Sequence, residues 1–145
     1  MNNSEYDLLK LMENSNTIIV PNGYFNDDSI TSFNITNNRR LKRIEIGENC
    51  YGKVRVLDLN GLSELESVVI GQKSFRISDD ERNDGSYRIV NCPKLKSIQI
   101  GYESFNDYHS FELNNLPSLQ SIDIGRKCFS WTPSFSLIGL IDGLV

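Results

Sequence analysis

The sequence predicts a mainly β solenoid, and three observations support this fold class. A segment of the form Leu-x-x-Ile/Val-x-Ile-Gly starts at Leu41, Leu65, Leu95 and Leu119. Each copy is followed by an aromatic residue preceded by Ser or Cys, and then by a segment in which two apolar residues flank a polar one. A repeat of about 24 to 30 residues is typical of solenoids. We therefore expect a short right-handed solenoid of about five coils, built from stacked parallel strands.

The first element expected is a short helix over residues 4–13. Ser4 can accept a hydrogen bond from the backbone three residues further on, and Asp7 suits the positive first turn of a helix. Leu8 and Leu9 would belong to its apolar stripe. The end of a solenoid would otherwise expose its core to water, so terminal units are atypical. This helix is therefore expected to cap the first coil.

The solenoid is expected over residues 17–145, after a capping region over residues 1–16. Its coils would start near residues 15, 41, 65, 95 and 119. Residues two apart point to the same side of a strand, so the apolar pair of each segment should face the core. Because the equivalent strand comes one whole coil later, stacked strands must be parallel. Two of the inward columns expected are Ile18, Ile44, Val68, Ile98, Ile122 and Phe25, Tyr51, Phe75, Phe105, Phe129.

Two further columns mark the corners of each coil. The column after the first strand is mostly glycine, which indicates either a positive φ or a close approach between neighbouring coils. The column after the second strand holds only Asn or Gly, the residues that adopt the left-handed region at least cost. The first column is Pro21, Gly47, Gly71, Gly101 and Gly125, and the second is Asn37, Gly61, Asn91, Asn115 and Gly139.

One coil is longer than the others by about six residues, which lie between Phe75 and Tyr87. This stretch, residues 76–86, is polar and has a glycine near its end. We expect a surface loop, because an insertion in a loop leaves the stacked strands undisturbed.

The three cysteines should not form a disulfide framework, since their number is odd. The repeat places Cys50 and Cys128 in one column, three coils apart. At the usual strand spacing this is about 14 Å, which is too far for a disulfide. Cys92 falls in a core column with Leu62 and Leu116. We expect three reduced thiols that pack as small hydrophobic side chains.

Composition and charge argue against several classes of protein. A net charge of -4 and a pI near 5.0 argue against a nucleic-acid binder that depends on phosphate contacts. No apolar run approaches the roughly 18 residues that a membrane span needs. The N-terminus has neither the basic start nor the apolar core of a secretory signal. We therefore expect a cytoplasmic protein, or a cell-surface one if the chain is a fragment of a longer protein.

The repeat resembles a known family. The pattern Leu-x-x-Ile-x-Ile-Gly, then Ser/Cys-Phe, then Phe-x-Leu-x-x-Leu-Pro is similar to the irregular leucine-rich repeats called BspA-like, and the similarity covers residues 17–142. The resemblance implies coils of the leucine-rich-repeat kind. Proteins of that family are often long surface-exposed adhesins or binding proteins. A surface adhesin or a carbohydrate-binding fragment is therefore one alternative that the resemblance implies.

Residues with catalytic or metal-binding chemistry are scarce. His109 is the only histidine, and its neighbours form no recognisable catalytic arrangement. Asp79, Glu81 and Asn83 loosely resemble a calcium loop, but Asp84 stands where such a loop needs glycine. No spacing of Cys or His residues matches a zinc site. We expect neither an enzyme nor a bound cofactor or metal.

The remaining candidates lie on the surface of the repeat. Residues between the core positions of each first strand form a mixed polar face, which suits protein binding but also any solvated sheet. Three aromatic residues in turns are of the kind enriched at binding hot spots, although packing over a neighbouring coil would also explain them. The candidate partner-binding residues are Lys42, Glu45, Glu66, Val69, Lys96, Gln99, Gln120, Asp123, Tyr102, Tyr108 and Trp131. We expect a non-catalytic scaffold that binds another protein, with no role for nucleic acid or membrane.

The last coil suggests a second class of function, a structural subunit that associates with copies of itself. No amphipathic helix or polar unit follows Leu140, so Phe129 and its neighbours are expected to face an open end with free strand edges. We expect a homodimer through this end, most simply a two-fold one. A plug formed by residues 141–145, or a longer array, would be the alternatives. The candidate self-association residues are Phe135, Leu137, Leu140, Leu144 and Val145.

Overall fold

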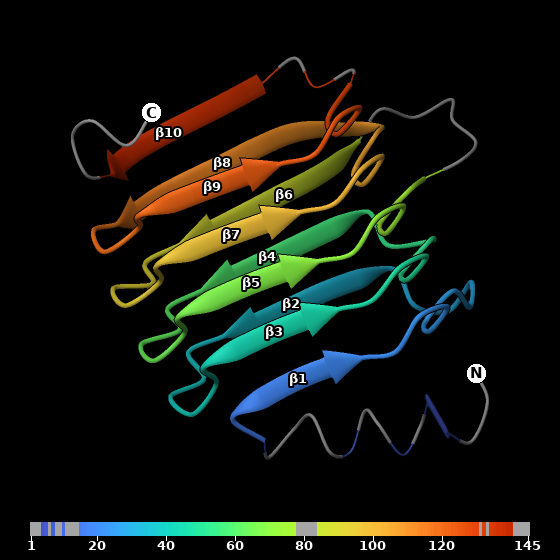
Figure 1. The fold of residues 1–145 in the computed structure, drawn as a ribbon, viewed down its shortest axis with the longest axis horizontal. Helices are drawn as coiled ribbons and strands as arrows, with labels where there is room; N and C mark the ends of the chain where they lie inside the picture. Colours follow the sequence, from blue (N-terminus) through green and yellow to red (C-terminus); the bar gives the residue numbers. More distant parts are fainter. Residues whose placement is uncertain are drawn as a thin grey trace.

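The computed structural model is built from two parallel β-sheets, and each coil of the chain contributes one strand to each sheet (Figure 1). The structure describes residues 4, 5, 7, 10, 15–77, 84–130, 132 and 134–140. Strands that are neighbours in a sheet are one whole coil apart in the sequence. The predicted mainly β solenoid of about five stacked coils is therefore confirmed.

The two sheets take alternate strands of the chain. Sheet A has the order β1-β3-β5-β7-β9, and sheet B has the order β10-β8-β6-β4-β2. The strands of sheet A are β1 (Thr17–Val20), β3 (Arg43–Ile46), β5 (Ser67–Ile70), β7 (Ser97–Ile100) and β9 (Ser121–Ile124). The strands of sheet B are β2 (Ser32–Thr36), β4 (Val56–Asn60), β6 (Gly85–Val90), β8 (Tyr108–Leu116) and β10 (Ser134–Leu140).

The register of the strands follows the sequence repeat. Ile44 pairs with Ile18 on one side and with Val68 on the other, and all three are buried. The same register continues through β7 to Ile122, which is half-buried because it lies in the last strand of sheet A. The inward columns predicted from residues two apart are therefore confirmed.

A column of five aromatic rings runs through the core along the stacking direction. Neighbouring ring centroids are 5.1, 5.0, 4.7 and 5.2 Å apart, and the interplanar angles are 23°, 15°, 9° and 1°. Aromatic pairs of this kind contribute about 0.5–1.5 kcal/mol each beyond the area that they bury. The rings belong to Phe25, Tyr51, Phe75, Phe105 and Phe129. The coils are therefore held together by side-chain stacking as well as by the strand hydrogen bonds.

The backbone of every residue in this aromatic column is left-handed, with φ between 53° and 63°. For a residue with a Cβ, this conformation costs about 1–2 kcal/mol. The tight turn that follows each strand of sheet A needs it, because it directs the ring into the core. Ring stacking and burial offset the cost. Glycine and asparagine are the residues that usually indicate a left-handed conformation, so this feature could not be predicted from the aromatic residues of the column.

The two corner columns have different physical causes. In the Asn and Gly column, φ lies between 55° and 70° at all five positions, as predicted. In the other column, Gly71 is present because of close approach: a Cβ on it would lie 2.6 Å from the carbonyl carbon of Gly47 in the preceding coil. A Cβ on Gly101 would likewise lie 2.6 Å from the amide nitrogen of Gln72. Of the two explanations that the sequence left open, close approach is correct here.

The Ser and Cys column before the aromatic rings forms a second link between coils. Each side chain donates a hydrogen bond to the carbonyl of the corner residue in the preceding coil. The donor–acceptor distances are 3.1, 2.7, 2.9 and 2.9 Å for Cys50, Ser74, Ser104 and Cys128. All three cysteines of the chain are free thiols, and Cys92 lies in the core column that the repeat predicted.

The predicted N-terminal capping helix falls mostly on residues outside those that the structure describes. Two described residues of this segment contact the first coil. The carboxylate of Glu5 is buried and accepts a hydrogen bond of 2.8 Å from the amide of Phe25. The hydroxyl of Tyr24 donates to the hydroxyl oxygen of Ser4 at 3.2 Å. These contacts attach the N-terminal segment to the first coil.

The inserted stretch differs at its ends from the predicted loop. Ile77 is buried in the core, although it falls inside the stretch expected to be a surface loop. At the other end, β6 already begins at Gly85, so that residue and the next belong to sheet B. Residues 78–83 lie outside the part of the chain that the structure describes.

Candidate functional site

The outer face of sheet A carries a row of four candidate partner-binding residues. In the register of the sheet, Glu45 pairs with Val69, Val69 with Gln99, and Gln99 with Asp123. The four side chains therefore lie in line across the sheet, at about 4.8 Å per strand. Glu45 forms an ion pair with Arg43. Gln99 and Asp123 are exposed, and neither side chain has a hydrogen bond or ion pair to another described residue.

A second row of candidates lies where each coil enters sheet A. The amides of Glu66, Lys96 and Gln120 each donate to the carbonyl of the row member before them, at 2.8, 2.9 and 2.8 Å. This row begins at Lys42, and it continues the ladder of sheet A beyond the strands. Lys96 Nζ lies 3.7 Å from Glu66 Oε1. The second row therefore borders sheet A at the start of its strands.

Three serines separate these two rows. Ser67, Ser97 and Ser121 share one register position at the start of their strands. They alternate with the inward residues, so their side chains point out of sheet A. None of the three side chains has a hydrogen bond to another described residue. Arg43 shares this register position, so the row of serines is confined to the last three strands of sheet A.

Ile19, which lies in β1 on the same outer face, was not among the candidate residues predicted from the sequence. Its side chain is 56% exposed, and it pairs in register with Glu45. Its exposure could have been predicted, because side chains alternate along a strand and its neighbour Ile18 points into the core. An exposed isoleucine in line with Val69 gives the face two apolar side chains among polar ones.

The predictions for the three aromatic residues in turns have different outcomes. Tyr102 is half-buried in the turn after β7, and Lys127 Nζ lies 5.7 Å from the centroid of its ring. Trp131 lies outside the described residues. The placement of Tyr108 in a turn outside the core was wrong, because its side chain is fully buried and its hydroxyl donates to Val54 O at 2.6 Å.

The inserted coil explains the position of Tyr108. Gly85 in β6 pairs with Tyr108 in β8, and the register shifts between Gly85 and Ser86. A Cβ on Gly85 would lie 2.9 Å from the ring of Tyr108, so the glycine provides the space that the ring occupies. The tyrosine therefore fills the core beside the longer coil, and it cannot contact a partner.

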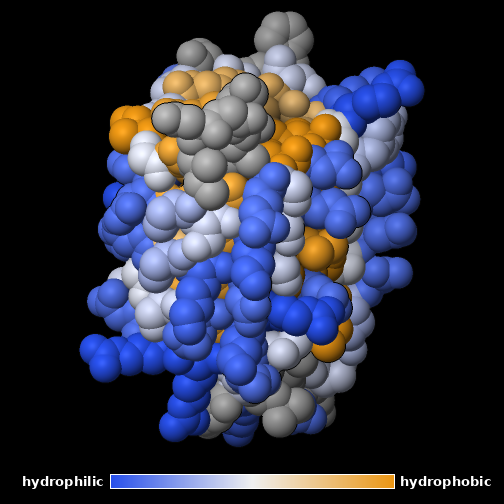
Figure 2. Space-filling model, turned by 60° about the vertical axis from the view of Figure 1, so that its left-hand side comes forward, coloured by the Kyte–Doolittle hydropathy of each residue, from blue (hydrophilic) through white to orange (hydrophobic). Residues whose placement is uncertain are grey.

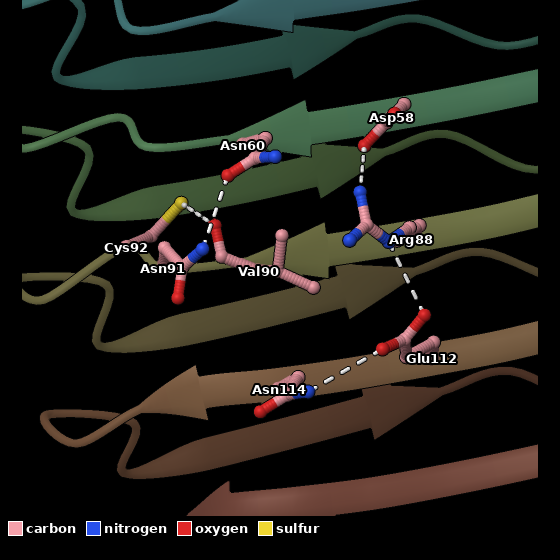
Figure 3. A network of polar contacts seen from close by, with 8 residues as sticks. All are labelled: Asp58, Asn60, Arg88, Val90, Asn91, Cys92, Glu112 and Asn114. Carbon is pink, nitrogen blue, oxygen red and sulfur yellow. Dashed lines mark hydrogen bonds and ion pairs between the residues drawn. The ribbon is translucent and has the colours of Figure 1, made fainter.

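In the middle of the outer face of sheet B, polar side chains bind one another (Figure 3). Arg88 lies between two carboxylates, at 3.3 Å from Asp58 and 3.2 Å from Glu112. The amide group of Asn114 donates to the other oxygen of Glu112 at 3.5 Å. These four residues come from β4, β6 and β8, in the middle of the sheet. Arg88 is therefore paired on both sides, whereas Gln99 and Asp123 on sheet A have no partner among the described residues.

Apolar side chains are exposed on the last two strands. The space-filling view shows hydrophobic surface gathered at the end of the molecule where β9 and β10 lie (Figure 2). The exposed fractions are 37% for Ile124, 55% for Phe135, 41% for Leu137 and 56% for Ile138. Ile124 and Ile138 were not among the predicted residues. Both could have been predicted to be exposed, because each lies in the last strand of its sheet.

The other predictions for this end have mixed outcomes. Phe129 is buried, contrary to expectation, because the rings of Phe111 and Phe135 pack over it at 4.9 and 6.1 Å. Leu140 is half-buried. Leu144 and Val145 lie outside the described residues.

Few of the described side chains are of the kind that catalyse reactions or bind metal ions. Among the described residues, no cluster of three or more His, Cys, Asp or Glu side chains could hold a metal ion. His109 is exposed at the start of β8, and the calcium-like residues Asp79, Glu81 and Asn83 lie outside the described part. Burial raises the pKa of the Cys50 and Cys92 thiols, so both stay protonated at neutral pH. Within the described ranges, no helix is long and apolar enough to cross a membrane.

Comparisons of the chain with protein-family models, with curated proteins and with solved structures found no match.

Proposed function

We propose that this protein is a non-catalytic scaffold of the leucine-rich-repeat kind that binds another protein through the outer face of sheet A. The similarity of its repeat to the BspA-like pattern supports a binding role. The observation that carries the proposal is the difference between the two outer faces. Gln99 and Asp123 on sheet A have free side chains, whereas Arg88 on sheet B is held between two carboxylates.

Free polar groups and exposed apolar groups are what a partner can use. A buried hydrogen-bonding group is costly when it is left unpaired, so a partner gains most where the groups that it covers are still available. On sheet A, the free amide of Gln99 lies beside Val69, and Ile19 is exposed in the same row. On sheet B, a partner that covers β6 would first have to break the ion pairs of Arg88.

The experiment compares two matched serines, one on each outer face. Ser97→Arg places a long charged side chain in the middle of sheet A, and Ser110→Arg does the same on sheet B. Both serines are half-buried and belong to outward positions, so neither change should disturb the core. Affinity capture from the native cell, with quantitative mass spectrometry, measures partner binding. The proposal predicts that the parent and Ser110→Arg capture the same partner and that Ser97→Arg does not. Equal capture of that partner by the two variants would refute the proposal.

A second candidate function is self-association through the last coil, and the exposed Phe135 and Leu137 favour it. The strand orders end at β9 and β10, so both strands have a free edge among the described residues. The opposite end of the solenoid is different, because Glu5 accepts the amide hydrogen of Phe25 there. Unlike ends disfavour head-to-tail stacking, so we infer a two-fold dimer of last coil against last coil.

Light scattering at tens of micromolar tests this dimer. The parent should have twice the mass of the chain, and Leu137→Asp should convert it to a monomer. Ser130→Asp is a control, because it adds the same charge near this end at an exposed polar residue. A monomeric parent would eliminate self-association without affecting the proposal for sheet A.

A further inference from the structure

We propose that a cationic hollow beside the first strand of sheet A binds the carboxylates of an acidic segment in the protein partner, an inference that rests on the proposed function. The hollow has a volume of about 620 Å³ and is lined by Ser15, Asn16, Arg39, Arg40, Lys42 and Glu64. The chain as a whole has a net charge of -4, so a concentration of positive charge here is a local feature and not a consequence of composition.

The three cations of the hollow are unpaired. Arg39, Arg40 and Lys42 are all exposed, and no described carboxylate lies within ion-pair distance of any of them. By contrast, the described surface holds ion pairs elsewhere, for example between Arg55 and Asp84. The face of the molecule that carries the coil corners is strongly hydrophilic toward the first coils (Figure 2).

The repeat explains why these cations lack partners. Glu64 occupies the same corner position as Arg40 in the coil before and Lys94 in the coil after. Both oxygens of Glu64 accept hydrogen bonds from Lys94 Nζ, at 3.0 and 2.9 Å, so this carboxylate is already paired. Glu66 is likewise 3.7 Å from Lys96 and leaves Lys42 free. The carboxylates that adjoin these cations in the repeat are therefore already paired with lysines.

The backbone that carries the cations is fixed before any ligand binds. The side chain of Asn38 accepts hydrogen bonds from the amides of Arg40 and Leu41, at 2.7 and 3.0 Å. The amide of Lys42 donates to Asn16 O at 2.7 Å. A turn held on both sides reduces the entropy that is lost when its side chains are ordered by a ligand.

Guanidinium groups favour a carboxylate ligand, because their planar donors match its two oxygens. The hollow also adjoins the row that begins at Lys42, so a segment bound there would lead directly onto the outer face of sheet A. The partner implied is a protein with several Asp or Glu residues at the edge of its contact surface.

The test measures fluorescence anisotropy of a labelled hexaglutamate peptide on the whole chain, with a hexaglutamine peptide as the neutral control. The variant Arg39→Gln/Arg40→Gln/Lys42→Gln should weaken hexaglutamate binding by about tenfold or more, since a hydrogen bond to a charged group is worth at least that factor. The matched control Lys53→Gln/Lys73→Gln/Arg126→Gln removes the same charge from turns at the other corner of the coils. It should weaken binding by about threefold or less at 150 mM salt, where distant charges are screened.

Three results would overturn the proposal. The first is no binding of hexaglutamate by the parent, and the second is equal weakening by the two triple variants, which would show diffuse attraction. The third is displacement of the peptide by inorganic phosphate at a lower concentration than by succinate, which would make the hollow a phosphate site. Because the ligand is synthetic, failure here leaves the comparison of Ser97→Arg with Ser110→Arg to decide the proposed function independently.

Discussion

Two buried tyrosines should respond in opposite ways to the loss of their hydroxyl groups. Tyr87 and Tyr108 are both 0% exposed in the core. The hydroxyl of Tyr108 donates to Val54 O at 2.6 Å, whereas the hydroxyl of Tyr87 has no hydrogen-bond partner among the described residues. We predict that Tyr108→Phe lowers the free energy of unfolding and that Tyr87→Phe raises it.

The magnitudes follow from the two environments. Tyr108→Phe removes a hydrogen bond and leaves the carbonyl of Val54 buried without its partner, a loss of about 1–3 kcal/mol. Tyr87→Phe removes an unpaired hydroxyl whose burial costs about 1–3 kcal/mol in protein mutants. The void left by one oxygen offsets part of this gain, by about 0.3 kcal/mol for roughly 12 Å³ at ~24 cal/mol per Å³. The two variants should therefore differ by about 2 kcal/mol or more.

Urea unfolding monitored by tryptophan fluorescence and circular dichroism measures both changes. The slope of the free energy with urea should stay constant, so that the midpoint alone reports stability. In thermal unfolding, the same difference corresponds to a separation of about 4 °C or more for a chain of this size. Loss of stability in Tyr87→Phe as large as in Tyr108→Phe would refute the assignment of an unpaired hydroxyl.

Five other substitutions and one titration test the rest of the fold. Ile100→Ala in the buried column should cost about 2–5 kcal/mol, whereas Ser97→Ala on the outer face should stay within about 0.5 kcal/mol, as urea midpoints will show. Lys73→Gly should raise the free energy of unfolding by about 1 kcal/mol, because φ is 58° at this position, and a loss would contradict the left-handed turn. Cys50→Ser should be tolerated, since serine fills its column elsewhere, but Cys92→Ser should cost about 1–3 kcal/mol in an apolar column. Burial raises the folded-state pKa of both thiols above the ordinary 9.0, so the unfolded chain loses its protons first. Stability should therefore fall as the pH rises above about 9, which thermal unfolding at several pH values will test.

The stacked strands could be predicted because the repeat records them directly. Residues two apart, such as Ile98 and Ile100, must face the same way in a strand, and an Asn at a corner indicates a left-handed residue. The left-handed aromatic column could not be predicted, because a residue such as Phe105 adopts that conformation only when stacking in the core offsets its cost. The position of Tyr108 depended on the shifted register at Gly85, which a regular repeat does not contain.

The candidate surface could be predicted only in part. The repeat placed Gln99 and Asp123 in one row, and the register of sheet A confirms that they are neighbours. Which side chains remain unpaired depends on side-chain rotamers. Glu64, for example, has a cation at the equivalent position of both neighbouring coils, Arg40 and Lys94. Only the structure shows that it binds Lys94 and leaves Arg40 without a partner.

Site-specific photocrosslinking tests the central claim most directly, because it reports which face a partner touches. A benzophenone amino acid is placed at Gln99 on sheet A or at Asn34 on sheet B, both of which are exposed outward positions. After irradiation in an extract of the native cell, Gln99 should give a crosslinked species of defined mass, and Asn34 should not. The same crosslinked species from both positions, or a species from Asn34 alone, would contradict the proposed interaction surface.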